Sequence, residues 1–376
     1  MRERAATIQD VAQRAGVSTA SVSRYVHAPQ SVSPATGQRI EDAIVSLNYI
    51  PNFAARSLTG ASSQAVYLIV PNLSNPVFAE AFNATREILR AQGHSLFVSE
   101  SNFSAEIESQ LIETLVQRRA EAVILLGCQH DPRAIELLQS RNVVVVETWS
   151  ISQDSTFLNV GFDNRAAGYA IANHLLEKGC KKICFIAPDL KGSDRMTHRY
   201  EGFCDALRNH NIPLEDGNYY EASGLHFGEG ARIFEHIISD APDIDGCVFA
   251  SDVLAAGAIL AASHLNIRIP QDMRVVGIDN MEISRLVKPM LTTVQIEGER
   301  LGEWVGRLIL QRLGQLPEAD QKQLEQSISS AKTHEQQNAV ILDSGDVLRF
   351  SGPERSAAAI RQVELGFRLI ERDSSR

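Results

Sequence analysis

Charged residues follow several apolar runs of the sequence, and their types are suited to binding a polyhydroxylated ligand. Glu147 ends the run VVVVE, Asp252 follows VFAS and Asp279 ends VVGID. Arg195 and Arg199 lie in the segment SDRMTHRYEGF. A guanidinium grips a carboxylate through two hydrogen bonds, so two arginines facing Glu147 and Asp279 predict a ligand with hydroxyl groups and a carboxylate. The alternative is that these acids are strand-end caps or ion-pair partners.

The elements that position these residues alternate between strands and helices. Apolar runs predict strands at 65–70, 94–99, 122–127, 143–148, 182–187, 246–251 and 274–279. Amphipathic segments between them predict helices at 77–92, 105–119, 165–178 and 253–265. This alternation is typical of parallel sheets covered on both faces, whose ligands bind beyond the carboxyl ends of the strands.

The N-terminal segment TIQDVAQRAGVSTASVSRYV predicts two short helices joined by a tight turn. Thr7 caps the first helix, with Asp10 three residues on as in a capping box, and Gly16 supplies the left-handed residue that ends it. Ser18 caps the second helix. A third helix begins in SVSPATGQRI, with Ser33 as cap. Two helices joined by a glycine turn and braced by a third predict a helix-turn-helix.

In a helix-turn-helix, early side chains of the second helix contact base edges in the major groove. Here these side chains are Thr19, Ala20, Ser21 and Arg24. Arg24 can contact guanine through two hydrogen bonds, and Thr19 and Ala20 can contact thymine methyl groups. The alternative is a small helical bundle without a role in nucleic-acid binding.

Composition restricts the class of protein. The 376 residues are 44% hydrophobic and 22% charged, as in an ordinary globular protein of two or three domains. Residues 1–63 carry six arginines against four acids, so this segment is +2 and the remainder of the −10 chain is −12. No apolar run is long enough to span a membrane, and no secretory signal begins the sequence. Five cysteines in apolar contexts fit reduced thiols in a cytoplasm.

The motifs of common enzymes do not occur in the sequence. It has no P-loop, HExxH or GxSxG motif. GLHFGEG lacks the dinucleotide-binding spacing, and Cys180 and Cys184 have no second pair of zinc ligands. We therefore expect no enzyme, no cofactor and no metal site.

The blocks DVAQRAGVSTASVSR and LNYIPNFAARSL, in this order, closely resemble the DNA-binding head of the LacI/GalR family of bacterial repressors. The resemblance implies a ligand-responsive repressor in which a homodimer, or a tetramer, binds a palindromic operator. It also implies a hinge helix in NYIPNFAARSLTG, where Leu58 wedges a base step apart, Ala55 permits close helix approach and Asn52 contacts the DNA. Arg56 occupies a position that varies in the family. Unstacking costs a few kcal/mol, which the larger contact with bent DNA offsets.

The set of residues expected to bind DNA combines the caps, the second helix and the hinge. Its members are Thr7, Ser18, Thr19, Ala20, Ser21, Arg24, Asn52, Ala55, Arg56 and Leu58. For Leu58, the alternative is a linker residue that rests on the body of the protein.

The resemblance also implies a body of two lobes, each with a doubly wound parallel sheet, as in periplasmic sugar-binding proteins. The segment PNLSNPVFAE then places Asn75 and Phe78 at the mouth of the cleft, and Arg199 is the better match to the family's effector-facing arginine. Where the family often has an aromatic platform, this sequence has Leu225, so we expect ring contacts from Phe78 or Trp149. The expected effector-binding residues are Asn75, Phe78, Glu147, Trp149, Arg195, Arg199, Asp252 and Asp279.

Domain boundaries follow from the same comparison. We expect the helix-turn-helix at 1–50, the hinge and linker at 51–63, and the effector-binding and dimerisation domain at 64–376. Its first lobe would comprise 64–162 and 294–316, and its second lobe 163–293 and 363–373. Residues 317–362 would be an insertion, either helical or disordered in its polar first half, with AVILDSGDVLRF as a hairpin. Surface elaboration is the plainest explanation for it.

The segments PNLSNPVFAE and NVGFDN resemble the gluconate-repressor branch of the family. We therefore expect a cytoplasmic repressor of carbohydrate genes that responds to a sugar acid such as gluconate. The alternatives are a regulator that responds to a neutral sugar or nucleoside-type ligand, or a cytoplasmic sugar-binding protein without DNA function.

Overall fold

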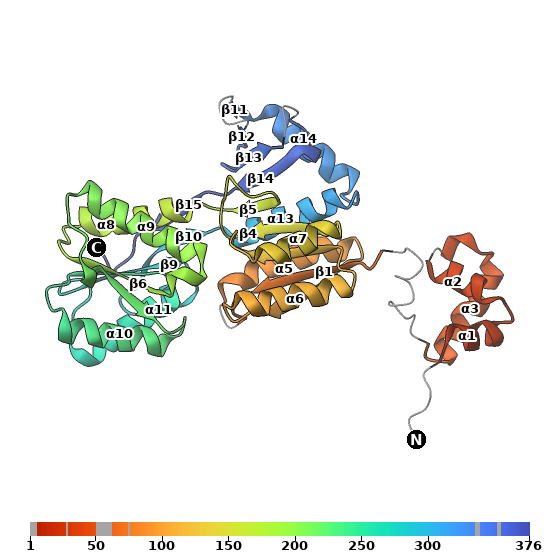
Figure 1. Cartoon of the computed structure of the whole chain (residues 1–376), viewed down its shortest axis with the longest axis horizontal. Coiled ribbons are helices and arrows are strands. Elements are labelled where there is room, and N and C mark those ends of the chain that lie inside the picture. Colours follow the sequence, from red (N-terminus) through yellow and green to blue (C-terminus); the bar gives the residue numbers. More distant parts are fainter. Residues whose placement is uncertain (1–5, 28, 50–61, 74–75, 335–338, 352–354) are drawn as a thin grey trace, which may run out of the picture. The chain divides into compact units, whose positions relative to one another are not determined.

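The computed structural model describes the chain except for residues 1–5, 28, 50–61, 74–75, 335–338 and 352–354 (Figure 1). Contacts divide it into residues 1–63 and residues 64–376, and each unit is described by itself below. Among the described residues, no helix is both long and apolar enough to cross a membrane.

The first unit contains α1 (Ile8–Ala15), α2 (Thr19–His27), the short helix η1 (Pro29–Ser31) and α3 (Pro34–Ser46). Thr7 and Asp10 form the predicted capping box of α1, and Gly16 ends the helix with φ 64°. The Ser18 hydroxyl accepts a hydrogen bond from the backbone N–H of Ser21 at 3.1 Å. These contacts confirm the predicted helix ends.

A small core holds the helices of the first unit together. Its fully buried side chains, contributed by α1, α2 and α3, are Val11, Val22 and Ile40. The Tyr25 hydroxyl of α2 donates to the carboxylate of Glu41 on α3. The apolar side chains of the three helices therefore pack into one core. The opposite face of α2 is left available for other contacts.

The first lobe of the second unit has a parallel sheet with the strand order β5-β4-β3-β1-β2. The strands are β1 (Ala65–Val70), β2 (Ser95–Glu100), β3 (Ala122–Leu126), β4 (Val144–Thr148) and β5 (Leu158–Gly161). The helices are α5 (Val77–Ala91), α6 (Ala105–Gln117), α7 (Pro132–Ser140) and α13 (Gly298–Arg312). Side chains of α5 and α13 cover one face of the sheet, and those of α6 and α7 cover the other.

The second lobe repeats this topology with the order β10-β9-β8-β6-β7. Its strands are β6 (Ile183–Pro188), β7 (Tyr219–Ala222), β8 (Gly246–Phe249), β9 (Arg274–Asp279) and β10 (Thr292–Ile296). Its helices are η2 (Leu190–Gly192), η3 (Asp216–Asn218), α8 (Asn164–Glu177), α9 (Asp194–Asn209), α10 (Phe227–Asp240), α11 (Asp252–Leu265) and α12 (Ile283–Leu286). The inner strands of both sheets are buried on both faces, which explains their nearly continuous apolar sequences, and the two parallel sheets confirm the predicted fold class.

The last part of the chain extends both sheets (Figure 1). It contains α14 (Glu318–Ser330), β11 (Lys332–His334), β12 (Ala339–Ile341), β13 (Val347–Phe350), η5 (Ala357–Ala359), β14 (Ile360–Glu364) and β15 (Phe367–Ile370). Strands β11 to β14 continue the first lobe's sheet beyond β5, with β14 parallel to β5. Strand β15 pairs antiparallel with β10 of the second lobe.

Two short segments belong to the other lobe from the one expected. Residues 294–296 lie in β10 of the second lobe, and residues 363–364 lie in β14 of the first. Residues 317–362 are also more than surface elaboration, because Asp346 is buried and accepts hydrogen bonds from Arg300 and Trp304 of α13. No local pattern pointed to this anchor, since Asp346 lies more than 40 residues from its partners.

Candidate functional site

The exposed face of α2 carries the residues predicted to contact bases. Thr19, Ala20 and Arg24 are exposed and Ser21 is partly exposed, while Val22 on the opposite face is fully buried. Arg24 forms no ion pair with any described acidic residue. The predicted side chains therefore share one accessible helix face. The Thr7 hydroxyl, by contrast, donates to Asp10 at 2.7 Å as part of the helix cap.

Several predicted residues lie outside the described part of the chain. They are Asn52, Ala55, Arg56 and Leu58 of the expected hinge, and Asn75 of the expected effector loop. Their proposed roles remain predictions.

Two of the cavities between the lobes of the second unit adjoin each other. The larger, about 480 Å³, is lined by Val77 and Trp149 of the first lobe and by Phe227, Asp279 and Met281 of the second, among others. The smaller, about 30 Å³, also contains Val77, Trp149 and Asp279 in its wall. Because they share these side chains, we treat the two cavities as one site, the interlobe cleft.

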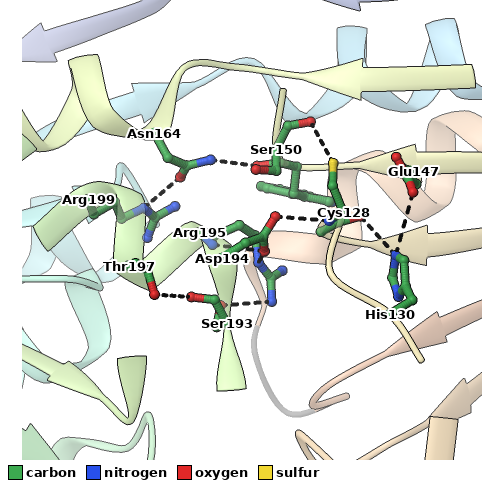
Figure 2. A network of polar contacts seen from close by, with 12 residues as sticks. Cys128, His130, Glu147, Ser150, Asn164, Ser193, Asp194, Arg195, Thr197 and Arg199 are labelled. Atoms are coloured by element: carbon green, nitrogen blue, oxygen red, sulfur yellow. Dashed lines mark hydrogen bonds and ion pairs between the residues drawn. The ribbon is translucent and has the colours of Figure 1, made fainter. Parts of the chain in front are cut away.

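Arg199 and Asp279 face each other in the interlobe cleft. Arg199 Nη2 lies 3.9 Å from Asp279 Oδ1, and both side chains are 5% exposed. Nε of Arg199 donates to Asn164 Oδ1 at 2.9 Å (Figure 2), and Nη1 donates to the carbonyl of Ala250, which follows β8, at 2.8 Å. The guanidinium is thus fixed by β8 and α8, with one edge toward Asp279.

Burial shapes the charges of this pair. It lowers the pKa of Arg199, although Asp279 opposes this effect. Burial also raises the pKa of Asp279 to about 6, against the opposing charge of Arg199 and the hydrogen bond from Ser251. The carboxylate therefore titrates in a range where a bound ligand can change its protonation.

Arg195 is the second buried cation of the cleft. It is 7% exposed, its Nη2 lies 3.5 Å from the Ser193 hydroxyl, and its Nε has no hydrogen-bond partner in the described structure. Burial lowers its pKa, with Asp194 opposing. A guanidinium with an unused buried donor is well suited to an anionic or strongly polar ligand.

Asp194, at the start of α9, joins the two lobes and was not predicted. Its Oδ2 accepts a hydrogen bond from the backbone N–H of Cys128 in the first lobe at 2.9 Å (Figure 2). Gly127 has φ +88°, and a Cβ there would lie 2.5 Å from Asp194 Oδ1. Only the fold brings these residues together, because 66 residues separate Asp194 from Cys128.

Glu147 lies away from the cleft cavities. Its carboxylate is 4.0 Å from His130 Nε2, and His130 Nδ1 lies 2.7 Å from Glu108. Burial raises the pKa of Glu147. Burial opposes the charging of His130, but its hydrogen bond to Glu108 raises the pKa of the imidazole above its ordinary value. Glu147 therefore belongs to a polar network inside the first lobe.

Asp252 has a structural role in the second lobe. It is fully buried and accepts hydrogen bonds from the Thr293 hydroxyl at 2.6 Å and from the N–H of Met281 at 2.8 Å. Burial raises its pKa, and the charge of Asp279 adds to this effect. Asp252 lines neither cavity of the cleft, and its hydrogen bond to Met281 supports the loop after β9.

Aromatic rings line the cleft from both lobes. Phe78 and Trp149 pack edge to face with ring centroids 5.0 Å apart, and both are nearly fully buried. Phe227, at the start of α10, is 44% exposed and lines the larger cavity. Leu225 lines the smaller one. The cleft thus offers ring faces for an apolar ligand surface.

Asn280 was also missed at the sequence level. It lines the larger cavity, and its Oδ1 accepts a hydrogen bond from Arg372 near the C-terminus at 2.6 Å. Arg372 also donates to the carbonyl of Leu291 at 2.7 Å. The only local signal for Asn280 was its position beside Asp279. The described His, Cys, Asp and Glu side chains form no group able to hold a metal ion.

Comparison with known proteins agrees with both parts of this structure. Residues 7–52 match the lacI family of bacterial regulatory proteins, and residues 172–330 match a periplasmic binding protein-like domain. The chain is 32% identical to the transcriptional repressor PurR of Actinobacillus pleuropneumoniae serotype 3, over 82% of this chain and 91% of that protein. It is 29% identical to the transcriptional regulator IdnR of Escherichia coli (strain K12), over 83% of this chain and 93% of that protein.

Solved structures show the same fold. A LacI-family regulator from Silicibacter pomeroyi superposes with a TM-score of 0.81 at 24% identity, over 99% of each chain. The lac repressor dimer bound to operator and an anti-inducer superposes with a TM-score of 0.75 at 22% identity, again over 99% of each chain. The chain belongs to the LacI family of bacterial regulators. It is a DNA-binding transcriptional repressor, and not an enzyme.

Proposed function

We propose that this repressor controls carbohydrate genes in response to a sugar acid bound in the interlobe cleft. The observation that carries the proposal is the pair of buried arginines. Arg195 has an unused buried donor, and Arg199 presents an edge toward Asp279 without a short ion pair. A carboxylate can accept two hydrogen bonds from one guanidinium, while Asp279 and Asn280 accept from or donate to hydroxyl groups.

The proposed mechanism links this cleft to the DNA. Two copies of α2 read the half-sites of a palindrome, because the symmetry of a dimer is mirrored in its operator. A ligand shifts the equilibrium only through different affinities for the DNA-competent and incompetent states. The contact between Asp194 and Cys128 spans the lobes, so it is one place where such states can differ. Acting on chromosomal DNA, the repressor would work in the cytoplasm.

The proposal is tested by calorimetric titration of the full chain with gluconate, glucose, ribose and a nucleoside. We expect gluconate to bind and glucose, which lacks the carboxylate, to bind at least about ten-fold more weakly. A neutral sugar or nucleoside as the sole ligand would contradict the sugar-acid proposal. A relative named ribose operon repressor makes ribose a relevant competitor, and the nucleoside tests the remaining alternative.

The arginines give a second test. Arg199→Ala should weaken effector binding by about 30-fold or more, because truncating one member of a buried charged contact costs about 2–5 kcal/mol. Operator binding without effector should not change. Arg199→Ala also breaks the hydrogen bond to Asn164, so it changes the packing of the cleft as well as its charge. Arg195→Gln is the companion variant, because it removes a donor, Nε, that has no hydrogen-bond partner. Fluorescence anisotropy on operator DNA, with and without gluconate, measures operator binding and the response to effector. A wild-type response in both variants would show that neither arginine contributes to effector binding.

A further inference from the structure

The first lobe carries a group of arginines at the edge of its sheet where the strands begin. We define this arginine rim as Arg118, Arg141, Arg312 and Arg361. Arg118 and Arg141 are the C-terminal caps of α6 and α7, Arg312 is the last residue of α13, and Arg361 lies at the start of β14. Arg118, Arg141 and Arg312 are exposed, and Arg361 is partly exposed.

Hydrogen bonds show that these residues share one edge with the start of β1. The N–H of Glu121 donates to the carbonyl of Ala65 at 3.0 Å, and the N–H of Val144 donates to the carbonyl of Glu121 at 2.9 Å. Arg118 precedes Glu121 by three residues, and Arg141 precedes Val144 by three. Arg312 and Arg361 line one hollow of about 510 Å³ together with Val144. Strand β1, which begins at Ala65, directly after residues 1–63 in the chain, starts at this same edge.

The arginine rim has no counter-ions in the described part of the chain. None of its four members forms an ion pair with a described acidic residue. The nearby Glu121 faces His94, at 3.5 Å. Four arginines without an ion pair therefore share one edge of a body whose net charge is −12.

The second lobe supplies an internal comparison, since it has the same topology. Cations also occur where its helices end, and three of them have acidic partners, although Lys181 forms no ion pair with a described acidic residue. Lys178 pairs with Glu371 at 2.9 Å, and Lys182 lies 3.9 Å from Glu215. Arg268 pairs with Asp272 in the same way. Favourable placement of cations at helix C-termini applies to both lobes, so it does not explain why the first lobe leaves its arginines unpaired.

We propose that the arginine rim binds phosphates of the DNA that flanks the operator. This rests on operator binding by residues 1–63, which are followed in the chain by β1 and its start at this edge. Exposed guanidiniums without counter-ions match the phosphate backbone, and such contacts carry no sequence information. The rim therefore adds affinity and salt dependence to the base contacts made by α2, and gives the acidic body one positive surface.

The test measures operator affinity against salt concentration for the full chain. The duplex carries about two helical turns of flanking DNA on each side, each turn being about 10 bp. Removal of one phosphate interaction should reduce the slope of log K against log salt by about 0.9. We expect a smaller slope for Arg118→Gln/Arg141→Gln and for Arg312→Gln/Arg361→Gln, and no change when the operator has no flanks.

The matched control is Lys181→Gln/Lys182→Gln, which removes the same charge at the equivalent edge of the second lobe. It should leave the slope unchanged. Equal reductions in the arginine and lysine variants would show a general charge effect and overturn the proposal, as would wild-type slopes in both arginine pairs. Replacement by lysine, which keeps the charge, should restore the slope. Operator binding by the wild-type chain, and its response to effector, are measured independently of the salt slope. A failure of the arginine-rim proposal can therefore be told apart from a failure of the proposed function.

Discussion

At the scale of single residues, the cleft combines strain, burial and charge in Asp279. This residue ends β9 with φ 119°, a left-handed conformation that is costly for any residue but glycine. Ser251 donates to its Oδ2 at 3.1 Å, and the following Asn280 is held by Arg372. The surrounding structure therefore imposes the conformation of a carboxylate that lines the cleft, as expected for a binding residue.

The raised pKa of Asp279 has a defined effect on stability. The folded protein holds this proton up to about pH 6, whereas an unfolded chain releases it near pH ~3.9. Folding is therefore favoured by this group below about pH 4, and the contribution is lost as pH rises to about 6. The difference of about two pH units corresponds to about 3 kcal/mol. Asp279→Asn should remove this loss.

Thermal unfolding at about pH 4.5 and about pH 7.5, on either side of the folded-state pKa, measures the prediction. We expect the melting temperature of the variant to fall less than that of the wild type between the lower and the higher pH. Comparing the two differences cancels the contribution of Glu147, whose pKa does not depend on Asp279. The charge of Asp279 raises the pKa of Asp252, so its removal lowers that pKa and changes the melting temperature in the same direction. An identical pH dependence would mean that Asp279 is ionised in the folded protein throughout.

At the scale of elements, paired helices approach closely through glycines. A Cβ at Gly202 of α9 would lie 1.9 Å from the carbonyl of Arg165 on α8, and a Cβ at Gly168 would lie 2.0 Å from the carbonyl of Arg199. Helices α10 and α11 meet in the same way at Gly230. The close crossing of α8 and α9 places Arg199 within reach of Asn164, so helix packing fixes the geometry of the cleft.

Gly202→Ala should therefore damage both stability and effector binding. The methyl group meets backbone, which cannot rotate away, so we expect a loss of about 1–3 kcal/mol or more and about 2–4 °C in melting temperature for each kcal/mol. Calorimetry should show weaker effector binding because α9 carries both arginines. Gly217→Ala is the control, since nothing lies within 4 Å of its added Cβ. Equal behaviour of the two variants would contradict the packing argument.

At the scale of the whole molecule, the exposed apolar side chains predict where a second copy would bind. Strand β2 is the edge of the first lobe's sheet, and its Phe97 and Val98 are 47% and 39% exposed. Leu260 and Leu286 are exposed on the second lobe. An apolar edge strand left uncovered promotes association, so we expect β2 to contribute to the contact between two copies.

Phe97→Asp should shift the chain from dimer toward monomer. The substitution places a charge where we expect an apolar contact, and the resulting monomer should lose operator affinity because one half-site remains unbound. Analytical ultracentrifugation measures the association. Leu214→Asp is the control, because Leu214 is 55% exposed and lies outside both apolar regions. A dimer of wild-type stability in the Phe97 variant would exclude β2 from the interface.

Local structure and the class of protein could be predicted from the sequence alone. Caps such as Thr7 and Ser18 act over three residues, and a strand buried on both faces must be apolar along its length, so helix ends and strands follow from short-range rules. The spacing of apolar residues in α1 and α2 sets which side of α2 is exposed. For the same reason Thr19, Ala20 and Arg24 could be assigned to one face without coordinates.

Which polar residues meet, in contrast, depends on the tertiary structure. Glu147 and Asp252 follow strands just as Asp279 does, yet one points into the first lobe's interior and the other is bonded within the second. Asp194 and Arg372 reach their partners across 66 and 92 residues. The side of the sheet to which a strand-end carboxylate turns, and the partner it finds, depend on strand register and helix packing. These are set by contacts between distant segments, which no local pattern records.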